Sequence, residues 1–185
     1  MKRYSRILFL LTALLASIPA FAEEQANERI IAGWLEMVVL SPGQIQLKAK
    51  LDSGAKTSSI HAENIERFER DGKTWVRFDL PKGRNKNEVQ HSIEKPLFRE
   101  VKIKRHKLPP MKRSVVKLPF CIDGYHYTAQ FTLADRGNFN YPVLLGRRFL
   151  KGNILIDPGE TFLHSNKYDS KQCSQPKTSQ ASDNR

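Results

Sequence analysis

Cysteine is scarce in this chain: among its 185 residues, Cys121 and Cys173 are the only two. Two cysteines are too few for a disulfide framework, and no C-x-x-C pair offers the ligand spacing of a structural zinc site. The sequence leaves three states of the pair open, namely an intramolecular bridge, two free thiols or a link between two chains.

Motifs of metal- and nucleotide-dependent enzymes are missing too. There is no H-E-x-x-H, and the five histidines are scattered along the chain. Gly72-Lys73-Thr74 has the end of a P-loop, but the glycine that a P-loop needs five residues earlier is absent. We therefore expect neither a metal nor a cofactor. The alternative that stays open is a zinc site assembled in space around His61.

Long hydrophobic runs are absent except near the start of the chain. Ile7–Ile18 is apolar but short for a membrane span; it follows a cluster of three cations and leads to the A-x-A box Ala20-Phe21-Ala22. This order predicts a secretory signal peptide over residues 1–22 that is cleaved on export. The short apolar segment is typical of bacterial signals, so we expect a periplasmic protein. A retained membrane anchor is the alternative.

Acidic residues are in the minority: 19 Asp and Glu stand against 31 Lys and Arg, and the formal net charge is +12. A basic protein outside the cytoplasm can meet anionic lipid, lipopolysaccharide or acidic peptides. We expect a basic face that is simply solvated, and contact with the envelope or a membrane surface through this face is the alternative. The export signal argues against nucleic acid as a partner.

The residues after the signal fit one domain. Residues 23–29 form a polar leader, and residues 30–164 hold all the remaining patterned sequence. Residues 165–185 are rich in Ser, Lys, Gln, Asp and Asn, with too few apolar side chains to bury, so we expect a disordered tail. The domain between them is large enough to bury a core of its own.

Helical periodicity is scarce and alternation is common. Residues 44–52 (QIQLKAKLD) alternate apolar and polar side chains, as a half-buried strand does. We expect one short helix within Thr57–Phe68 and a helical turn over Arg147–Leu150, and the pattern as a whole predicts an all-β barrel or sandwich. Other strands are expected over 30–40, 72–80, 97–108, 114–135 (a pair) and 153–164, with hairpins at Asp71-Gly72 and Asp123-Gly124 and a break at Pro109-Pro110.

Asp52 stands at the end of the alternating strand and is followed by Ser53 and Gly54. A carboxylate held there can activate a water molecule, provided that a second acid polarises the carbonyl under attack. Two neighbouring carboxyl groups resist ionising together and share a proton. Gly54 lets the backbone approach a partner loop, and Ser53 can donate a hydrogen bond.

Several motifs follow one another along the domain. They are Gly33-Trp34-Leu35-Glu36, Ala49 to Ser58, Asp135-Arg136, Pro142 to Arg147 and Asp157-Pro158. Together they resemble the retropepsin-like aspartic proteases, whose signature is a hydrophobic strand, Asp-Ser/Thr-Gly-Ala and a later hydrophobic-hydrophobic-Gly segment leading into a short helix. The closer resemblance is to a bacterial group labelled ATP-dependent zinc protease, and it covers roughly residues 30–164.

The resemblance implies a closed β-barrel with one short helix after the Leu-Gly-Arg segment. It also implies an endopeptidase that acts on peptides or proteins without a cofactor. Since the chain holds a single Asp-Ser-Gly, the second carboxylate would be Asp52 of another copy in a homodimer. By carry-over Asp52 is the catalytic acid–base, and the residues that support it are Ser53, Gly54, Ala55, Thr57, Gly146 and Arg147.

The resemblance also makes residues 79–99 the candidate for the flap that covers the substrate, although they are longer and more charged than a retroviral flap. We expect Asp157 to be a turn acid, and Arg136 and Arg147 to pair with carboxylates such as Asp135 or Asp157. Two other functions stay open. One is a non-catalytic barrel that binds an envelope peptide or polymer through its basic segment at 97–113, and the other is a metal-dependent protease, as the group's label says.

Overall fold

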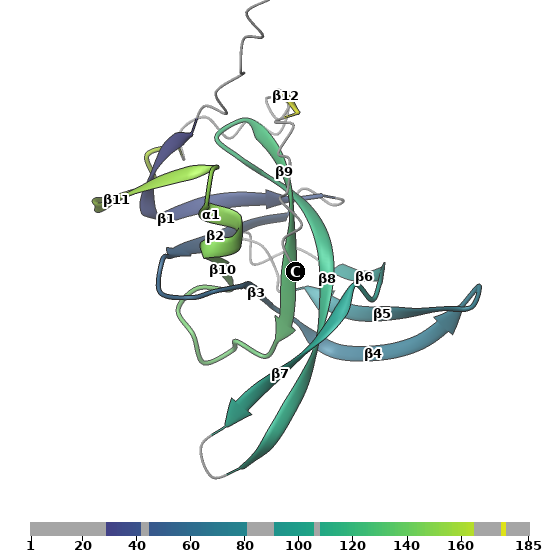
Figure 1. Cartoon of the computed structure of the whole chain (residues 1–185). Helices are drawn as coiled ribbons and strands as arrows, with labels where there is room; N and C mark the ends of the chain where they lie inside the picture. Colours follow the sequence, from purple (N-terminus) through teal and green to yellow (C-terminus); the bar gives the residue numbers. More distant parts are fainter. Residues whose placement is uncertain (1–28, 42–44, 81–90, 106–107, 165–174, 177–185) are drawn as a thin grey trace, which may run out of the picture.

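The computed structural model describes residues 29–41, 45–80, 91–105, 108–164 and 175–176. The secondary structure in these ranges is almost entirely β, and the single helix is α1 (Arg147–Leu150) (Figure 1). The all-β prediction is confirmed, and α1 has the bounds predicted for the helical turn. No helix within these ranges is long and apolar enough to cross a membrane.

Six strands form a ring. The ladder of neighbours runs β1–β2–β10–β3–β9–β8, and β1 also pairs with β8 through Val39 opposite Cys121 and Leu40 opposite Phe120. That last pairing closes the sheet on itself, so the predicted closed β-barrel is confirmed. The ring strands are β1 (Ile30–Leu40), β2 (Ile45–Asp52), β3 (Ser58–His61), β8 (Leu108–Ile122), β9 (Tyr125–Ala134) and β10 (Val143–Gly146).

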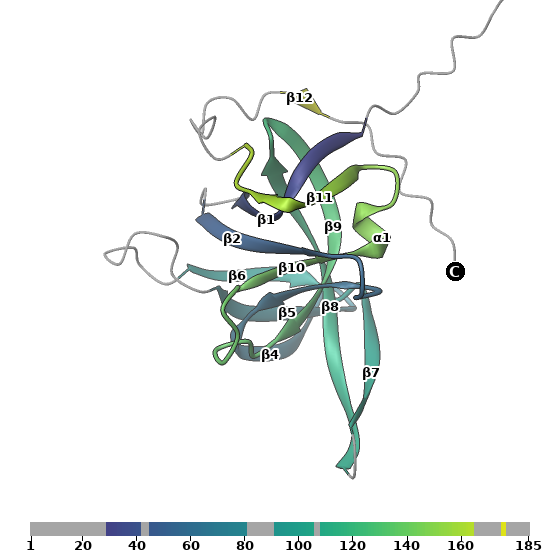
Figure 2. The ribbon, with the colours of Figure 1, turned by 90° about the vertical axis from the view of Figure 1, so that its left-hand side faces the viewer.

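The remaining strands extend this ring or lie beside it. β11 (Ile154–Thr161) runs parallel to β1, and β7 (Arg99–Arg105) pairs with β8 in a hairpin that projects far from the barrel (Figures 1 and 2). A separate sheet has the order β4–β5–β6. Its strands are β4 (Glu63–Arg70), β5 (Lys73–Leu80) and β6 (His91–Pro96).

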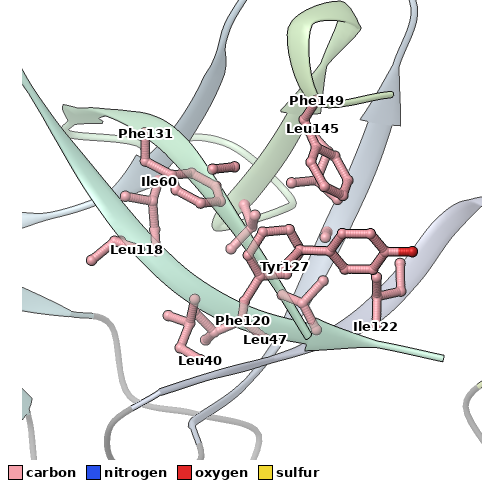
Figure 3. Close-up of a cluster of buried hydrophobic side chains, with 14 of the residues drawn as sticks. Leu40, Leu47, Ile60, Leu118, Phe120, Ile122, Tyr127, Phe131, Leu145 and Phe149 are labelled. Atoms are coloured by element: carbon pink, nitrogen blue, oxygen red, sulfur yellow. The ribbon is translucent and has the colours of Figure 1, made fainter. Parts of the chain in front are cut away.

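The barrel interior is apolar and rich in aromatic rings, and it also anchors α1. In β2 the alternation is as predicted, since Leu47, Ala49 and Leu51 are buried while Lys48 is exposed. Phe149 of α1 lies 5.1 Å from Phe120 and 5.2 Å from Tyr127, measured between ring centroids (Figure 3). Burial of such a side chain contributes about 1.5–3 kcal/mol, so α1 is held firmly against the core despite its short length.

Both predicted hairpins are confirmed. Asp71 and Gly72, which join β4 to β5, have φ angles of 51° and 67°. Asp123 and Gly124, which join β8 to β9, have φ angles of 53° and 75°. Positive φ at two successive positions is the geometry that tight turns need if they are to match the twist of the flanking strands.

The helix predicted within Thr57–Phe68 is wrong, because the structure has β3 and β4 there. Tertiary pairing overrides local preference: β3 lies between β9 and β10. Charged side chains of β4 instead form cross-strand ion pairs, such as Glu66 with Arg77 of β5 and Arg70 with Glu94 of β6. Glu and Arg both favour helices, so such a run predicts a helix as long as its cross-strand partners are not known.

The prediction that Pro109-Pro110 ends a strand is also wrong. β7 ends earlier, at Arg105, and both prolines stand inside β8. The ladder of β8 with β9 begins only at Val115, so at the prolines β8 has β7 alone as a neighbour. A proline is tolerated at such an edge because its missing N–H breaks no ladder on the open side.

Several predictions fall on residues outside the described ranges. These are the signal peptide at 1–22, the leader up to residue 28, the centre of the flap candidate at 81–90 and most of the tail. Within the tail, the structure describes β12 (Gln175–Pro176), which pairs with β9. Cys121 is disulfide-bonded, and the chain's other cysteine, Cys173, lies outside the described residues.

Candidate active site

Asp52 is the last residue of β2 and stands directly beside the end of β10. The two strands are parallel, with Leu145 next to Leu51 and Gly146 next to Asp52. β10 pairs with β3 on its other side, so the loop from Asp52 to Ser58 must pass around the end of β10. This crossing fixes the acid and the Leu-Gly-Arg segment against each other, although 93 residues separate Gly54 from Arg147 in the sequence.

The two oxygens of the Asp52 carboxylate have different surroundings. Oδ1 accepts hydrogen bonds from the backbone N–H groups of Gly54 (2.9 Å) and Ala55 (3.2 Å). Oδ2 lies 3.4 Å from Nζ of Lys50. The Asp52 side chain is 24% exposed, so solvent or a substrate can reach it. The backbone therefore fixes one oxygen while the other stays available for chemistry.

The pKa of Asp52 lies below its usual value. Burial raises the pKa, but the hydrogen bonds from Gly54 and Ala55 and the charge and hydrogen bond of Lys50 outweigh it. A lone Asp52 is accordingly ionised at neutral pH. An ionised carboxylate can accept a proton from water but cannot also donate one to a carbonyl, so the reaction needs a second, proton-bearing group.

Gly146 is required by the close approach of the Asp52 loop. A Cβ atom built on it would lie 2.6 Å from the carbonyl carbon of Thr57 and 3.0 Å from the oxygen of Ala55. Its N–H donates to the hydroxyl oxygen of Ser58 at 3.1 Å. The backbone N–H of Arg147 donates to the carbonyl of Ala55 at 2.9 Å. Three of the predicted support residues, Ala55, Thr57 and Gly146, thus meet through their backbones.

Arg147 holds the tip of the loop. Its guanidinium donates to the carbonyl oxygens of Ser53 and Gly54, each at 2.8 Å. The expectation that Arg147 pairs with a carboxylate is wrong, since it forms no ion pair within the described part of the chain. Both hydrogen bonds come from one nitrogen, Nη1, so a single amino group of the guanidinium joins the two adjacent carbonyls of the loop.

Arg136 is a site residue whose place the sequence did not reveal. Its guanidinium donates to the Ser59 hydroxyl (3.0 Å) and the Tyr141 carbonyl (3.3 Å) and stacks on the ring of Phe139. Burial and the charge of Arg113 lower the pKa of Arg136, and the negative charge of Asp52 acts in the opposite direction. Arg136 therefore belongs to the electrostatic surroundings of Asp52.

The carboxylates expected to pair with Arg136 make other contacts. Asp135 Oδ1 accepts from the backbone N–H of Gly137, and Asp157 Oδ1 accepts from that of Gly159, each at 2.9 Å. Asp157 thus forms the local turn that was predicted. The pairing of Arg136 with either acid is not seen among the described residues, where backbone groups compete successfully for both carboxylates.

His61, around which a zinc site was conceivable, has protein partners at both ring nitrogens. Nδ1 accepts from the backbone N–H of Arg136 at 2.8 Å, and Nε2 lies 3.2 Å from Oε1 of Glu63. Within the described ranges, no three His, Cys, Asp or Glu side chains come together as metal ligands would.

The chain resembles known proteins over most of this barrel. A family model described as RimB-like, "Retropepsin-like aspartic endopeptidase RimB", matches residues 31–167. The crystal structure of a Legionella pneumophila protein of unknown function superimposes with a TM-score of 0.64 at 36% identity, covering 74% of this chain and 99% of that one.

Curated relatives carry a different name. Proteins called "probable alpha-L-glutamate ligase" are 36% identical over 116 residues in Shewanella halifaxensis and 32% identical over 135 residues in Parasynechococcus marenigrum. The matched part is 63% and 71% of this chain but only 25% and 28% of those proteins. The chain therefore spans about a quarter of these relatives, and their name describes much longer proteins. With its family model, its barrel and its Asp-Ser-Gly-Ala loop beside Leu-Gly-Arg, the chain belongs to the RimB-like family of retropepsin-like aspartic endopeptidases.

Proposed function

We propose that this protein is an exported, periplasmic aspartic endopeptidase that works as a homodimer. The observation that carries the proposal is the Asp52 carboxylate, whose Oδ1 is fixed by backbone N–H groups while the side chain remains 24% exposed. Ser53 and Gly54 beside it are exposed and able to meet their own copies. A two-fold axis near this loop would bring two Asp52 side chains together.

The paired carboxylates would share one proton and hold a water molecule between them. The ionised Asp52 accepts a proton from this water as the oxygen attacks the carbonyl carbon of the peptide. The protonated Asp52 of the other chain donates its proton to the carbonyl oxygen, which gives a neutral tetrahedral diol. Proton transfer to the amide nitrogen then accompanies cleavage of the C–N bond, and no covalent enzyme intermediate or cofactor takes part.

Inhibitor chemistry separates this mechanism from metal-dependent proteolysis. We expect a statine-type inhibitor, which mimics the tetrahedral diol, to abolish peptide hydrolysis, because such a group binds between two carboxylates. A chelator such as EDTA should leave the rate unchanged. The measurement is cleavage of a fluorogenic peptide library with each reagent. Loss of activity with the chelator, restored by added zinc, would instead support the metal-dependent alternative.

Positive charge around Asp52 points to a substrate class. Lys50 contacts the carboxylate directly, Arg136 interacts with its charge, and the charge of Arg113 acts on Arg136. These cations exceed what one aspartate per chain can neutralise, so they favour a substrate that brings carboxylates of its own. The curated relatives are named probable alpha-L-glutamate ligases, a name that also refers to glutamate. We therefore propose acidic, glutamate-rich peptides as substrates.

This substrate class predicts a strong dependence on charge and salt. Peptides with glutamate on both sides of the scissile bond should be cut at least about ten times more efficiently than glutamine counterparts, since each desolvated ion pair contributes about 1–2 kcal/mol. The advantage should shrink as salt is raised. The measurement is kcat/KM for matched peptides at low and high salt. Equal values for the two peptides would contradict the proposal.

The projecting β7–β8 hairpin supports a second candidate function. It carries Lys102 and Lys112 opposite each other, near Arg113, and Glu100 is the one acid between 99 and 113. Such an arm could bind an anionic envelope polymer without cleaving it. If this alternative holds, a variant without Asp52 should still bind the polymer. The intact protein should show no hydrolysis.

A further inference from the structure

Among the described residues, Lys50 is the one cation within ion-pair distance of the Asp52 carboxylate. The two residues are two positions apart in β2, so both side chains point to the same face of the strand. Nζ of Lys50 lies 3.4 Å from Oδ2 of Asp52, and the lysine side chain is 43% exposed. Since Gly54 and Ala55 occupy Oδ1, Lys50 acts on the oxygen that would face the second carboxylate.

We propose that Lys50 is a positioning residue for the reaction: its ammonium group sets the pH range over which the paired Asp52 carboxylates hold a single proton. This inference rests on the proposed dimeric protease. It assigns to Lys50 a role in the reaction itself, which the spacing of the Asp-Ser-Gly-Ala motif does not require.

The direction of the effect follows from the charges that face Asp52. Those that lower the pKa of Asp52 are Lys50 from β2 and the Gly54 and Ala55 N–H groups of its own loop. Arg136, from the segment after β9, interacts with the charge of Asp52 but is not among them, and Arg147 is occupied by the Ser53 and Gly54 carbonyls. Lys50 and the two N–H groups favour the ionised carboxylate, so they lower the pH range in which the pair carries one proton. Loss of the Lys50 charge should raise this pH range again.

The test is the pH profile of kcat/KM for Lys50→Met, Lys50→Arg and the unchanged dimeric protein. We expect both limbs of the Lys50→Met profile to move upward by about one pH unit, since an opposite charge at this range shifts a carboxyl by roughly that amount. Lys50→Arg retains the charge and should restore the original profile. Lys48→Met is the matched control, because Lys48 is exposed on the same face of β2 but is not among the groups that shift Asp52.

A second readout keeps the test decisive if Lys50→Met is too slow for kinetics. The Asp52 carboxyl carbon can be followed by NMR against pH in the labelled dimer, and its titration should move upward in Lys50→Met alone. An unchanged profile and titration in Lys50→Met would overturn the role of Lys50 while leaving the protease proposal intact. If the unchanged protein hydrolyses no peptide, the protease proposal fails, whereas the titration still reports on Lys50.

Discussion

Replacing Asp52 by asparagine is expected to abolish peptide hydrolysis, with a loss in kcat of about a thousand-fold or more. Asparagine keeps an oxygen that can accept from Gly54 and Ala55, so the loop should stay in place. It can neither accept a proton from water nor share one with a second chain. The measurement is the single-turnover rate on a glutamate-rich peptide, with folding checked by circular dichroism.

The matched control is Asp157→Asn. Asp157 also accepts from a backbone N–H two residues ahead, but in the local turn at Gly159. This variant should keep full activity. The Asp52→Asn protein should still bind peptide, because the surrounding cations remain. Hydrolysis that persists in Asp52→Asn would rule out Asp52 as the acid–base, and peptide binding without hydrolysis by the unchanged protein would favour the non-catalytic barrel.

Asp52→Asn should also change the response of the fold to acid. The folded-state pKa of Asp52 lies below its unfolded value, so its ionised form adds stability above the unfolded pKa. This stabilising contribution is lost as the pH falls through the folded-state pKa of Asp52. The variant should therefore be slightly less stable than the unchanged protein at neutral pH and equally stable in strong acid.

The second large effect is expected for Gly146→Ala. The added methyl group would lie 2.6 Å from Thr57 and 3.0 Å from Ala55, both backbone atoms that cannot rotate away. The Asp52 loop or β10 would have to move, at a cost of about 3 kcal/mol in the free energy of unfolding. The shift would also misplace Asp52, so we expect activity to fall further than the stability loss alone explains. Denaturant unfolding and kcat/KM measure the two effects.

Gly152→Ala provides the comparison for this variant. Gly152 has φ of +82° but no atom within 4 Å of a built Cβ, so the change introduces backbone strain without a clash. It should cost about 1 kcal/mol and leave the activity nearly intact. Similar stability losses for the two variants, with activity retained in Gly146→Ala, would show that the packing of the Asp52 loop on β10 does not position the acid.

The sequence predicts the parts of this molecule that depend on local pattern. Alternation places Lys50 and Asp52 on one face of β2, and the apolar segment that ends at Gly146 predicts the helical turn that became α1. β4 was misread because its Glu and Arg residues are paired across strands, with Arg77 of the adjacent β5 and Glu94 of β6. The sequence singled out Arg136 but not its partner, since Ser59 on β3 lies 77 residues away.

The central claim is that two chains each supply one Asp52, and mixing tests it directly. Unchanged and Asp52→Asn chains are co-refolded at varied ratios, with total protein held constant, and the hydrolysis rate is measured. If each site needs two intact aspartates, the rate should follow the square of the unchanged fraction, giving about one quarter of full activity in an equal mixture. A rate proportional to that fraction, about one half in the equal mixture, would mean that each chain acts alone and would contradict the account.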